Sequence, residues 1–129
     1  MAPGLSTLES TLALYTDLGV DVAYTELDVR FNTTSGDLAT KEAAQADVYV
    51  NVFQSCLNNE RCIGITIWGA TDKYSWIPGV FPGEGDALLW DENYQKKPAY
   101  QAVLAAINGA SNSTTSGTAA AKYRFRNML

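Results

Sequence analysis

The chain has 129 residues, enough for one ordinary domain with an apolar core. Its net charge of −5 argues against nucleic acid or an anionic membrane as partner, since both require a basic surface. Histidine is absent, which excludes Ser-His-Asp and Cys-His catalysis and most zinc sites and leaves carboxylate chemistry. We expect no metal and no other cofactor.

The first predicted element is a helix over residues 6–18. Ser6 and Glu9 fit a capping box, in which each side chain satisfies a backbone amide of the other residue. Gly19 then fits the left-handed position at which helices commonly end.

A strand is predicted next, over residues 21–28. Strict alternation places Tyr24, Glu26 and Asp28 on one face and delivers Glu26 at the carboxyl end of the strand. Because Asp28 lies two residues further on the same face, its side chain would run parallel to that of Glu26. We therefore interpret Asp28 as a structural partner for a basic group or loop amide.

The second half begins with a predicted helix over residues 40–57 and a strand over residues 62–68. Trp68 ends this strand. Its three isoleucines are expected on one face: Ile63, Ile65 and Ile67. The loop over residues 69–96 is long enough to be functional, and a third helix is predicted from Pro98 to Gly109.

The composition changes after the third helix. Residues 109–121 are rich in Gly, Ser, Thr and Ala, as in a flexible linker, and residues 122–129 form a basic, aromatic tail without periodicity. We therefore expect a folded unit over residues 1–108, followed by a linker and tail over residues 109–129.

Alternating strands and helices predict an α/β fold with parallel strands. The most informative residues follow the two strands, as at the catalytic face of a (β/α)8 barrel. Such a barrel takes roughly 250 residues, so this chain would hold about half of one.

The strand ends suit carbohydrate chemistry. A retaining glycosidase needs two carboxyl groups, and Glu26 is a candidate for one of them. Trp68 and Trp76 are candidates for stacking on sugar rings. Three residues before Trp76 either bind sugar hydroxyls or fix the loop: Asp72, Lys73 and Tyr74. The later acidic residues are expected to form a solvated surface: Glu84, Asp86, Asp91 and Glu92.

Several features point to an extracellular protein. Asn32 and Asn112 begin N-glycosylation sequons. Cys56 and Cys62 flank a predicted turn and form either a short-loop disulfide or two buried thiols. Residues 1–4 lack the basic stretch and apolar run of a signal peptide, so we expect that the natural N-terminus is missing.

Four motifs in one order resemble a known family. They are Tyr24-Thr25-Glu26-Leu27-Asp28, Gly64-Ile65-Thr66-Ile67-Trp68-Gly69, Asp72-Lys73-Tyr74-Ser75-Trp76 and Lys97-Pro98-Ala99-Tyr100. Together they resemble the C-terminal part of fungal glycoside hydrolase family 10 endo-β-1,4-xylanases, over roughly residues 5–107.

The resemblance implies the last two strand units of a (β/α)8 barrel, secretion, and retaining cleavage of xylan. It implies that Glu26 is the nucleophile, that Trp68 and Trp76 line the glycone subsites, and that Cys56 and Cys62 form a disulfide. Some members carry a Ser/Thr-rich linker like the segment after Gly109.

The resemblance also implies that part of the catalytic machinery lies outside this chain. The family's acid/base glutamate and the histidine that binds the nucleophile would both precede Met1, so we expect the isolated chain not to hydrolyse xylan. Open strand edges predict self-association or binding of a complementing N-terminal fragment. The alternatives are a non-catalytic carbohydrate-binding protein and a related barrel glycosidase that acts on another β-1,4-glycan.

Overall fold

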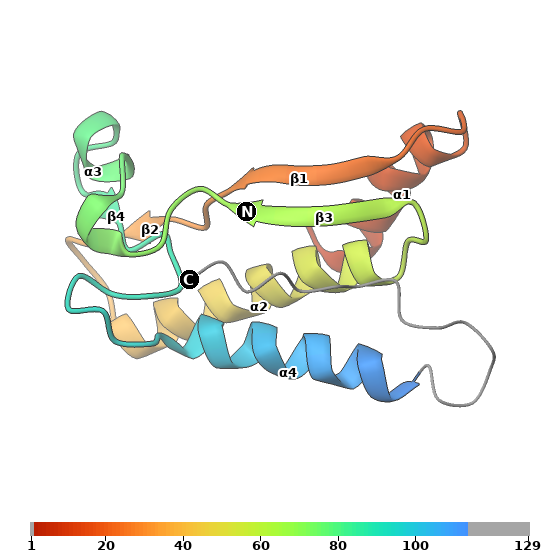
Figure 1. Cartoon of the computed structure of the whole chain (residues 1–129). Coiled ribbons are helices and arrows are strands. Elements are labelled where there is room, and N and C mark those ends of the chain that lie inside the picture. The colour runs from red at the N-terminus through yellow and green to blue at the C-terminus, as the bar shows by residue number, and fades with distance from the viewer. Residues whose placement is uncertain (1, 114–129) are drawn as a thin grey trace.

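The computed structural model describes the backbone of residues 2–113 and the side chains of residues 2–109. Helices and short strands alternate along this part of the chain (Figure 1). The elements are α1 (Leu5–Thr16), β1 (Val22–Leu27), β2 (Phe31–Asn32), α2 (Leu38–Leu57), β3 (Cys62–Ile67), η1 (Asp72–Tyr74), α3 (Ile77–Val80), β4 (Glu84–Gly85) and α4 (Pro98–Ser113).

The central feature is the parallel pair β1–β3, which α2 connects. This arrangement confirms the predicted α/β class. Both strands point toward the same end of the molecule, where α3, β2 and β4 gather (Figure 1). There β2 pairs antiparallel with β4, so the loops that follow β1 and β3 are joined directly. The segment after Asp28 and the long loop after Trp68 therefore both contain regular structure.

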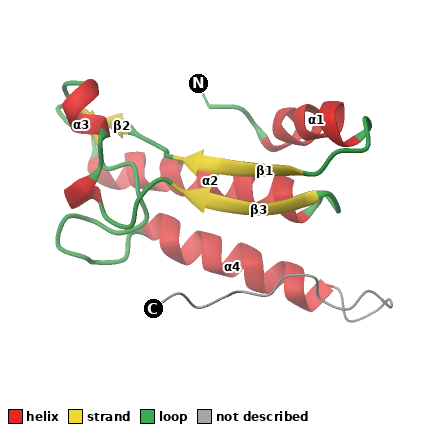
Figure 2. Cartoon of the chain, turned by 45° about the horizontal axis from the view of Figure 1, so that its top comes forward, coloured by secondary structure: helices red, strands yellow, loops and turns green. Residues whose placement is uncertain are grey.

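The core lies between α2, α4 and the segment that leads into α4. Ala46 and the fully buried Tyr49 of α2 pack there with Leu89, Ala99 and Val103. Leu27 and Ile67, at the ends of the paired strands, also pack against this cluster. The apolar residues of α2 and those at the strand ends are thus buried in the same core. Figure 2 shows α2 behind the two strands, and Figure 1 shows α4 on the side of α2 that faces away from the strands.

A β-bulge in β1 changes which side chains share a face. Tyr24 pairs with Ile65 and Leu27 with Ile67, so two residues of β1, Thr25 and Glu26, oppose the single Thr66 of β3. The Tyr24 hydroxyl bonds the Ser55 hydroxyl of α2 at 2.8 Å, and Leu27 packs against the core below. Tyr24 and Leu27 therefore face the helix layer, while Glu26 is exposed. The prediction that Tyr24 and Glu26 share a face is wrong, because alternation is interrupted at the bulge.

A second register shift affects the start of β3. Val22 pairs with Cys62 but Ala23 pairs with Gly64, which leaves Ile63 out of register. Ile63 is 70% exposed, whereas Ile67 packs against the core cluster. The predicted alternation that would place the three isoleucines on one face is therefore interrupted at Ile63.

The ends of α1 differ from the capping prediction. The helix begins at Leu5 after Gly4, and no side chain caps it, so the Ser6–Glu9 capping box is not formed. Glu9 instead accepts a hydrogen bond from the Asn58 side chain at 2.6 Å and so ties α1 to the end of α2. Gly19 has a φ of +84°, which confirms its left-handed conformation.

Two further helix boundaries differ from the predicted ones. Asp37 caps α2 by accepting from the backbone N–H of Thr40 at 2.8 Å, so this helix begins earlier than the apolar pattern indicated. Helix α4 continues through Gly109 to Ser113, so the composition change at Gly109 does not mark the end of regular structure. The rest of the predicted linker and the tail lie outside the described residues. No helix in the described part is long and apolar enough to cross a membrane.

Candidate active site

The carboxyl ends of β1 and β3 bring Glu26 and Trp68 to neighbouring positions. The backbone N–H of Trp68 donates to the Leu27 carbonyl at 3.2 Å, one residue beyond Glu26. Both residues are solvent-accessible, and Trp68 is 51% exposed. Among the described residues, no hydrogen bond or ion pair engages the Glu26 carboxylate. A carboxylate in this state is free to meet a ligand.

Trp76 comes to the same end of the sheet from the loop after β3. Its indole N–H donates to Asp28 Oδ2 at 2.7 Å, and its ring packs edge-to-face against Phe81 at 5.8 Å. The ring nevertheless stays 45% exposed. Asp28 thus has the structural role expected of it, although its donor is an indole. The other oxygen of Asp28 is buried and has no hydrogen-bond partner in the described part of the chain.

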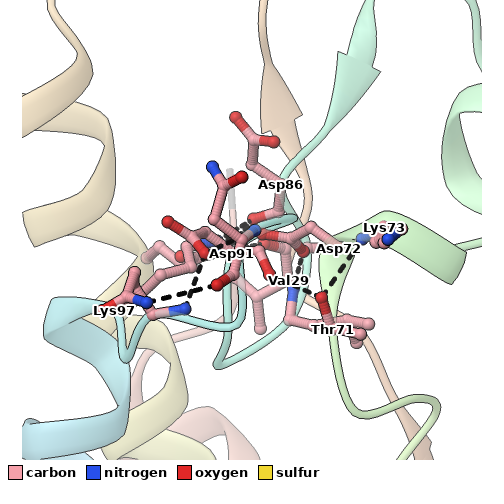
Figure 3. Close-up of polar contacts among 12 residues, drawn as sticks. Val29, Thr71, Asp72, Lys73, Asp86, Asp91 and Lys97 are labelled. Carbon is pink, nitrogen blue, oxygen red and sulfur yellow. Dashed lines mark hydrogen bonds and ion pairs between the residues drawn. The ribbon is translucent and has the colours of Figure 1, made fainter.

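A buried ion pair anchors the loop that carries Trp76. Lys97 Nζ lies 3.0 Å from Asp72 Oδ2, and the two side chains are only 4% and 6% exposed. Asp72 Oδ1 accepts from the Leu88 backbone N–H at 2.8 Å, and Lys97 also donates to the Asp86 carbonyl at 2.6 Å (Figure 3). Burial raises the pKa of Asp72, while the Leu88 N–H and Lys97 act in the opposite direction. Of the two readings left open for Asp72, the structure supports loop fixation.

Helix α2 extends this polar cluster to the end of β1. Gln45 Nε2 donates to the carbonyls of Val29 at 2.6 Å and Asp86 at 2.5 Å. The Tyr49 hydroxyl donates to the Ala87 carbonyl at 2.6 Å, and burial raises the pKa of this phenol. Val29 follows Asp28 directly, so the same hydrogen bonds fix both the strand end and the loop after β3. The sequence analysis did not predict a role for Gln45 or Tyr49. Their position on the side of the helix that carries the apolar residues could have indicated one.

The acidic residues expected at the surface are mostly engaged. Glu84 forms an ion pair with Arg30, whose guanidinium lies 3.8 Å from the centre of the Phe81 ring. Asp91 accepts from two backbone N–H groups of its own turn, and Asp86 lies half-buried. Of the four, Glu92 alone is exposed, as predicted. No group of described residues is arranged to hold a metal ion.

The cysteines and sequons lie away from this end of the sheet or at its margin. Cys56 of α2 and Cys62 of β3 form a disulfide, which confirms the pairing implied by the resemblance. Asn32 is exposed in β2, and its Oδ1 accepts from the Thr34 backbone N–H at 3.0 Å. Asn112 lies in the last turn of α4, and its side chain is outside the described residues.

A free carboxylate and two exposed indoles at the carboxyl edge of parallel strands are the arrangement expected of a barrel glycosidase. The comparison with protein families agrees with that class. The family model described as glycosyl hydrolase family 10 matches residues 1–106. The chain belongs to this family, whose members have the (β/α)8 barrel fold.

Individual relatives give the same result. The chain is 64% identical over 107 residues to endo-1,4-beta-xylanase 2 of Aureobasidium pullulans, which covers 83% of this chain and 29% of that protein. Native xylanase 10B of Thermotoga maritima superposes with a TM-score of 0.83 at 38% identity, over 87% of this chain and 34% of that one. Xylanase 10B of Thermotoga petrophila, solved with xylobiose, gives a TM-score of 0.80 at 38% identity, over 84% and 33%. The chain therefore spans about a third of the length of the relatives it matches.

Proposed function

We propose that this chain is part of the catalytic domain of a secreted, retaining endo-β-1,4-xylanase and contributes its nucleophile, Glu26. The observation that carries the proposal is the exposed, unpaired carboxylate of Glu26 beside Trp68 at the carboxyl end of a parallel strand pair. Family membership and the xylanase names of the relatives supply the substrate class.

In this reaction the Glu26 carboxylate attacks the anomeric carbon of a xylose unit and forms a covalent glycosyl-enzyme. The leaving oxygen takes a proton from a second carboxyl group. That group then removes a proton from the water molecule that releases the sugar. The bulge in β1 supports the assignment, because it turns Glu26 away from α2 and toward the open face of the sheet.

Trp68 and Trp76 would bind the sugar chain next to Glu26. Each presents a large, half-exposed indole, and sugar rings offer apolar C–H faces that pack well against such surfaces. The hydrogen bond to Asp28 fixes the Trp76 ring before the ligand arrives, which lowers the entropic cost of binding.

The acid/base carboxyl group is proposed to come from residues beyond these 129. A retaining pair lies about 5 to 5.5 Å apart across the bond that is cleaved. Asp28 is unsuitable because one of its oxygens binds Trp76 and the other is buried. Asp72 is unsuitable because it is paired with Lys97 in the interior. The chain would then form the last two strand units of an eight-stranded barrel, with the catalytic part over residues 1–108, and the remaining units would supply this group.

Secretion and glycosylation belong to the same proposal. A disulfide is stable in an oxidising compartment. The exposed Asn32 lies in a sequon whose Thr34 hydroxyl already bonds the Asn32 side chain at 2.9 Å. We expect glycan attachment at Asn32, and at Asn112 on the sequon alone.

Complementation tests the function. The chain is mixed with a separately produced polypeptide that holds the rest of the Aureobasidium pullulans relative's domain, and reducing sugar released from xylan is measured. We expect activity only from the mixture, and none when Glu26→Gln replaces the parent chain. Binding of xylo-oligosaccharide without any hydrolysis by the mixture would instead favour a non-catalytic carbohydrate-binding role. Faster release of reducing sugar from another β-1,4-glycan than from xylan would instead identify that glycan as the preferred substrate.

A further inference from the structure

Two tyrosines that are far apart in the sequence meet at the surface of the loop region that carries Trp76. The Tyr94 hydroxyl donates to the Tyr74 hydroxyl at 3.2 Å. The Tyr74 residue is 73% exposed and Tyr94 is 54% exposed. Rings that remain this accessible bury little apolar area, so they contribute little to folding through the hydrophobic effect. Their surfaces are instead available for a ligand.

A lysine completes this surface group. Lys73 Nζ lies 5.6 Å from the centre of the Tyr74 ring and 5.4 Å from that of Tyr94. The neighbouring Asp72 is directed inward to its ion pair, whereas Lys73 is exposed and points away from that pair in Figure 3. The short helix η1 thus presents one residue to the interior and the next to solvent.

The Tyr94 ring is held in place by its own turn. Asp91 Oδ1 accepts from the backbone N–H groups of Asn93 at 2.8 Å and Gln95 at 2.7 Å, and the Tyr94 N–H donates to the Asp91 carbonyl at 3.1 Å. Tyr94 itself has a φ of +62°. A non-glycine residue rarely adopts this left-handed conformation, so the surrounding bonds must enforce it. Because this backbone is fixed and the Tyr94 hydroxyl bonds Tyr74, the Tyr94 side chain loses less conformational entropy on binding than a free one.

Tyr74 is equally constrained and keeps a proton to donate. Its backbone N–H donates to the carbonyl of the buried Thr71 at 3.1 Å, and Asp72 anchors the same turn. Because Tyr94 donates to Tyr74, the Tyr74 hydroxyl hydrogen remains available to another acceptor.

We propose that Tyr74, Tyr94 and Lys73 form a second carbohydrate contact, which binds a sugar ring of the same polysaccharide outside the Glu26 site. The phenol rings offer rigid apolar surface to the C–H faces of the sugar. The Tyr74 hydroxyl and the Lys73 ammonium donate to sugar hydroxyls. Continuity supports this occupant, since Tyr74 and Trp76 lie two residues apart on one loop. The inference rests on the proposed function for the identity of the ligand.

The test measures binding of xylohexaose to the full chain by calorimetry. We expect Tyr74→Ala/Tyr94→Ala to weaken binding about threefold to tenfold, and Lys73→Met to weaken it about twofold. Tyr15→Ala is the matched control, because Tyr15 is 55% exposed on α1 and belongs to neither group. It is expected to bind like the parent.

A second pair of variants separates this inference from the proposed function. Trp68→Ala/Trp76→Ala removes the indoles of the Glu26 site, and residual retention on insoluble xylan should then depend on the two tyrosines. Unchanged binding by the tyrosine variant in both backgrounds overturns the second contact and leaves the Glu26 site intact. Loss of binding in the tyrosine variant, with no effect of the tryptophan variant, supports the second contact and contradicts the proposed Glu26 site.

Discussion

The indole of Trp76 and the carboxylate of Asp28 are joined by a 2.7 Å hydrogen bond that connects the end of β1 to the loop after β3. Asp28 lies two residues beyond Glu26, so the strand that presents the proposed nucleophile also sets the position of a proposed sugar-binding ring. The β2–β4 pairing and the bonds from Gln45 hold the same two segments together behind them.

Removing the acceptor should free the Trp76 ring. We expect Asp28→Ala to weaken xylohexaose binding about tenfold, which corresponds to about 1.4 kcal/mol. The Trp76 indole N–H resonance should move toward the position of a solvated indole. Asp28→Asn is the control, because its amide oxygen can still accept the hydrogen bond. Equal affinity of the Ala variant and the parent would mean that the Trp76 ring needs no such support.

Removing one partner of the buried Asp72–Lys97 pair should destabilise the fold strongly. Lys97→Met leaves the Asp72 carboxylate buried without its cation, which typically costs about 3 to 5 kcal/mol of unfolding free energy. Urea denaturation measures the change. Asp21→Asn is the control, because it removes an exposed ion pair with Arg61 but leaves the hydrogen bond from Arg61 to the Val20 carbonyl. It should cost less than about 1 kcal/mol.

The same variant has a pH signature. Burial raises the pKa of Asp72, so the folded state binds a proton there more readily than the unfolded state. This group therefore favours folding below its unfolded pKa, and the contribution disappears as pH rises through the folded value. Loss of Lys97 strengthens the effect, so the stability deficit of Lys97→Met should shrink as the pH is lowered from 7. A deficit that stays constant with pH would argue against an ionised Asp72 in the interior.

Gly69, directly after Trp68, should tolerate no side chain. Its φ is +152°, and an added Cβ would lie 2.9 Å from Cδ1 of the fully buried Leu88. We expect Gly69→Ala to destabilise the chain by about 1 to 3 kcal/mol. It should also alter the near-ultraviolet circular dichroism of the tryptophans. Gly79→Ala serves for comparison, because a Cβ there meets no atom within 4 Å.

The cap of α2 should make stability depend on pH in the opposite direction from Asp72. The side-chain hydrogen bond from Thr40, followed by the Thr40 backbone N–H, lowers the pKa of Asp37 below its ordinary 3.8. Its contribution is therefore present above the unfolded pKa and is lost as pH falls through the folded value. Asp37→Asn keeps a capping oxygen but does not titrate. The difference in Tm between parent and variant should be larger at neutral pH than at about pH 3.

The sequence was sufficient for the order and type of the long elements, because apolar spacing reports directly on which face is buried. It was insufficient where pairing geometry matters. The orientation of Glu26 depends on a bulge, and a bulge depends on the register with β3 rather than on local alternation. Gly109 lies within α4, although glycine commonly ends a helix. The role of Asp72 required knowledge that Lys97, 25 residues later, returns to it.

Glu26 is proposed to be the residue that becomes covalently bonded to the sugar. The most direct test is mass spectrometry of the complemented domain after treatment with an activated 2-deoxy-2-fluoro-xylobioside, which traps the glycosyl-enzyme. We predict that the label is found on the peptide that contains Glu26 and is absent from the Glu26→Gln variant. A label on another carboxylate, or xylan hydrolysis that persists in Glu26→Gln, would contradict the account.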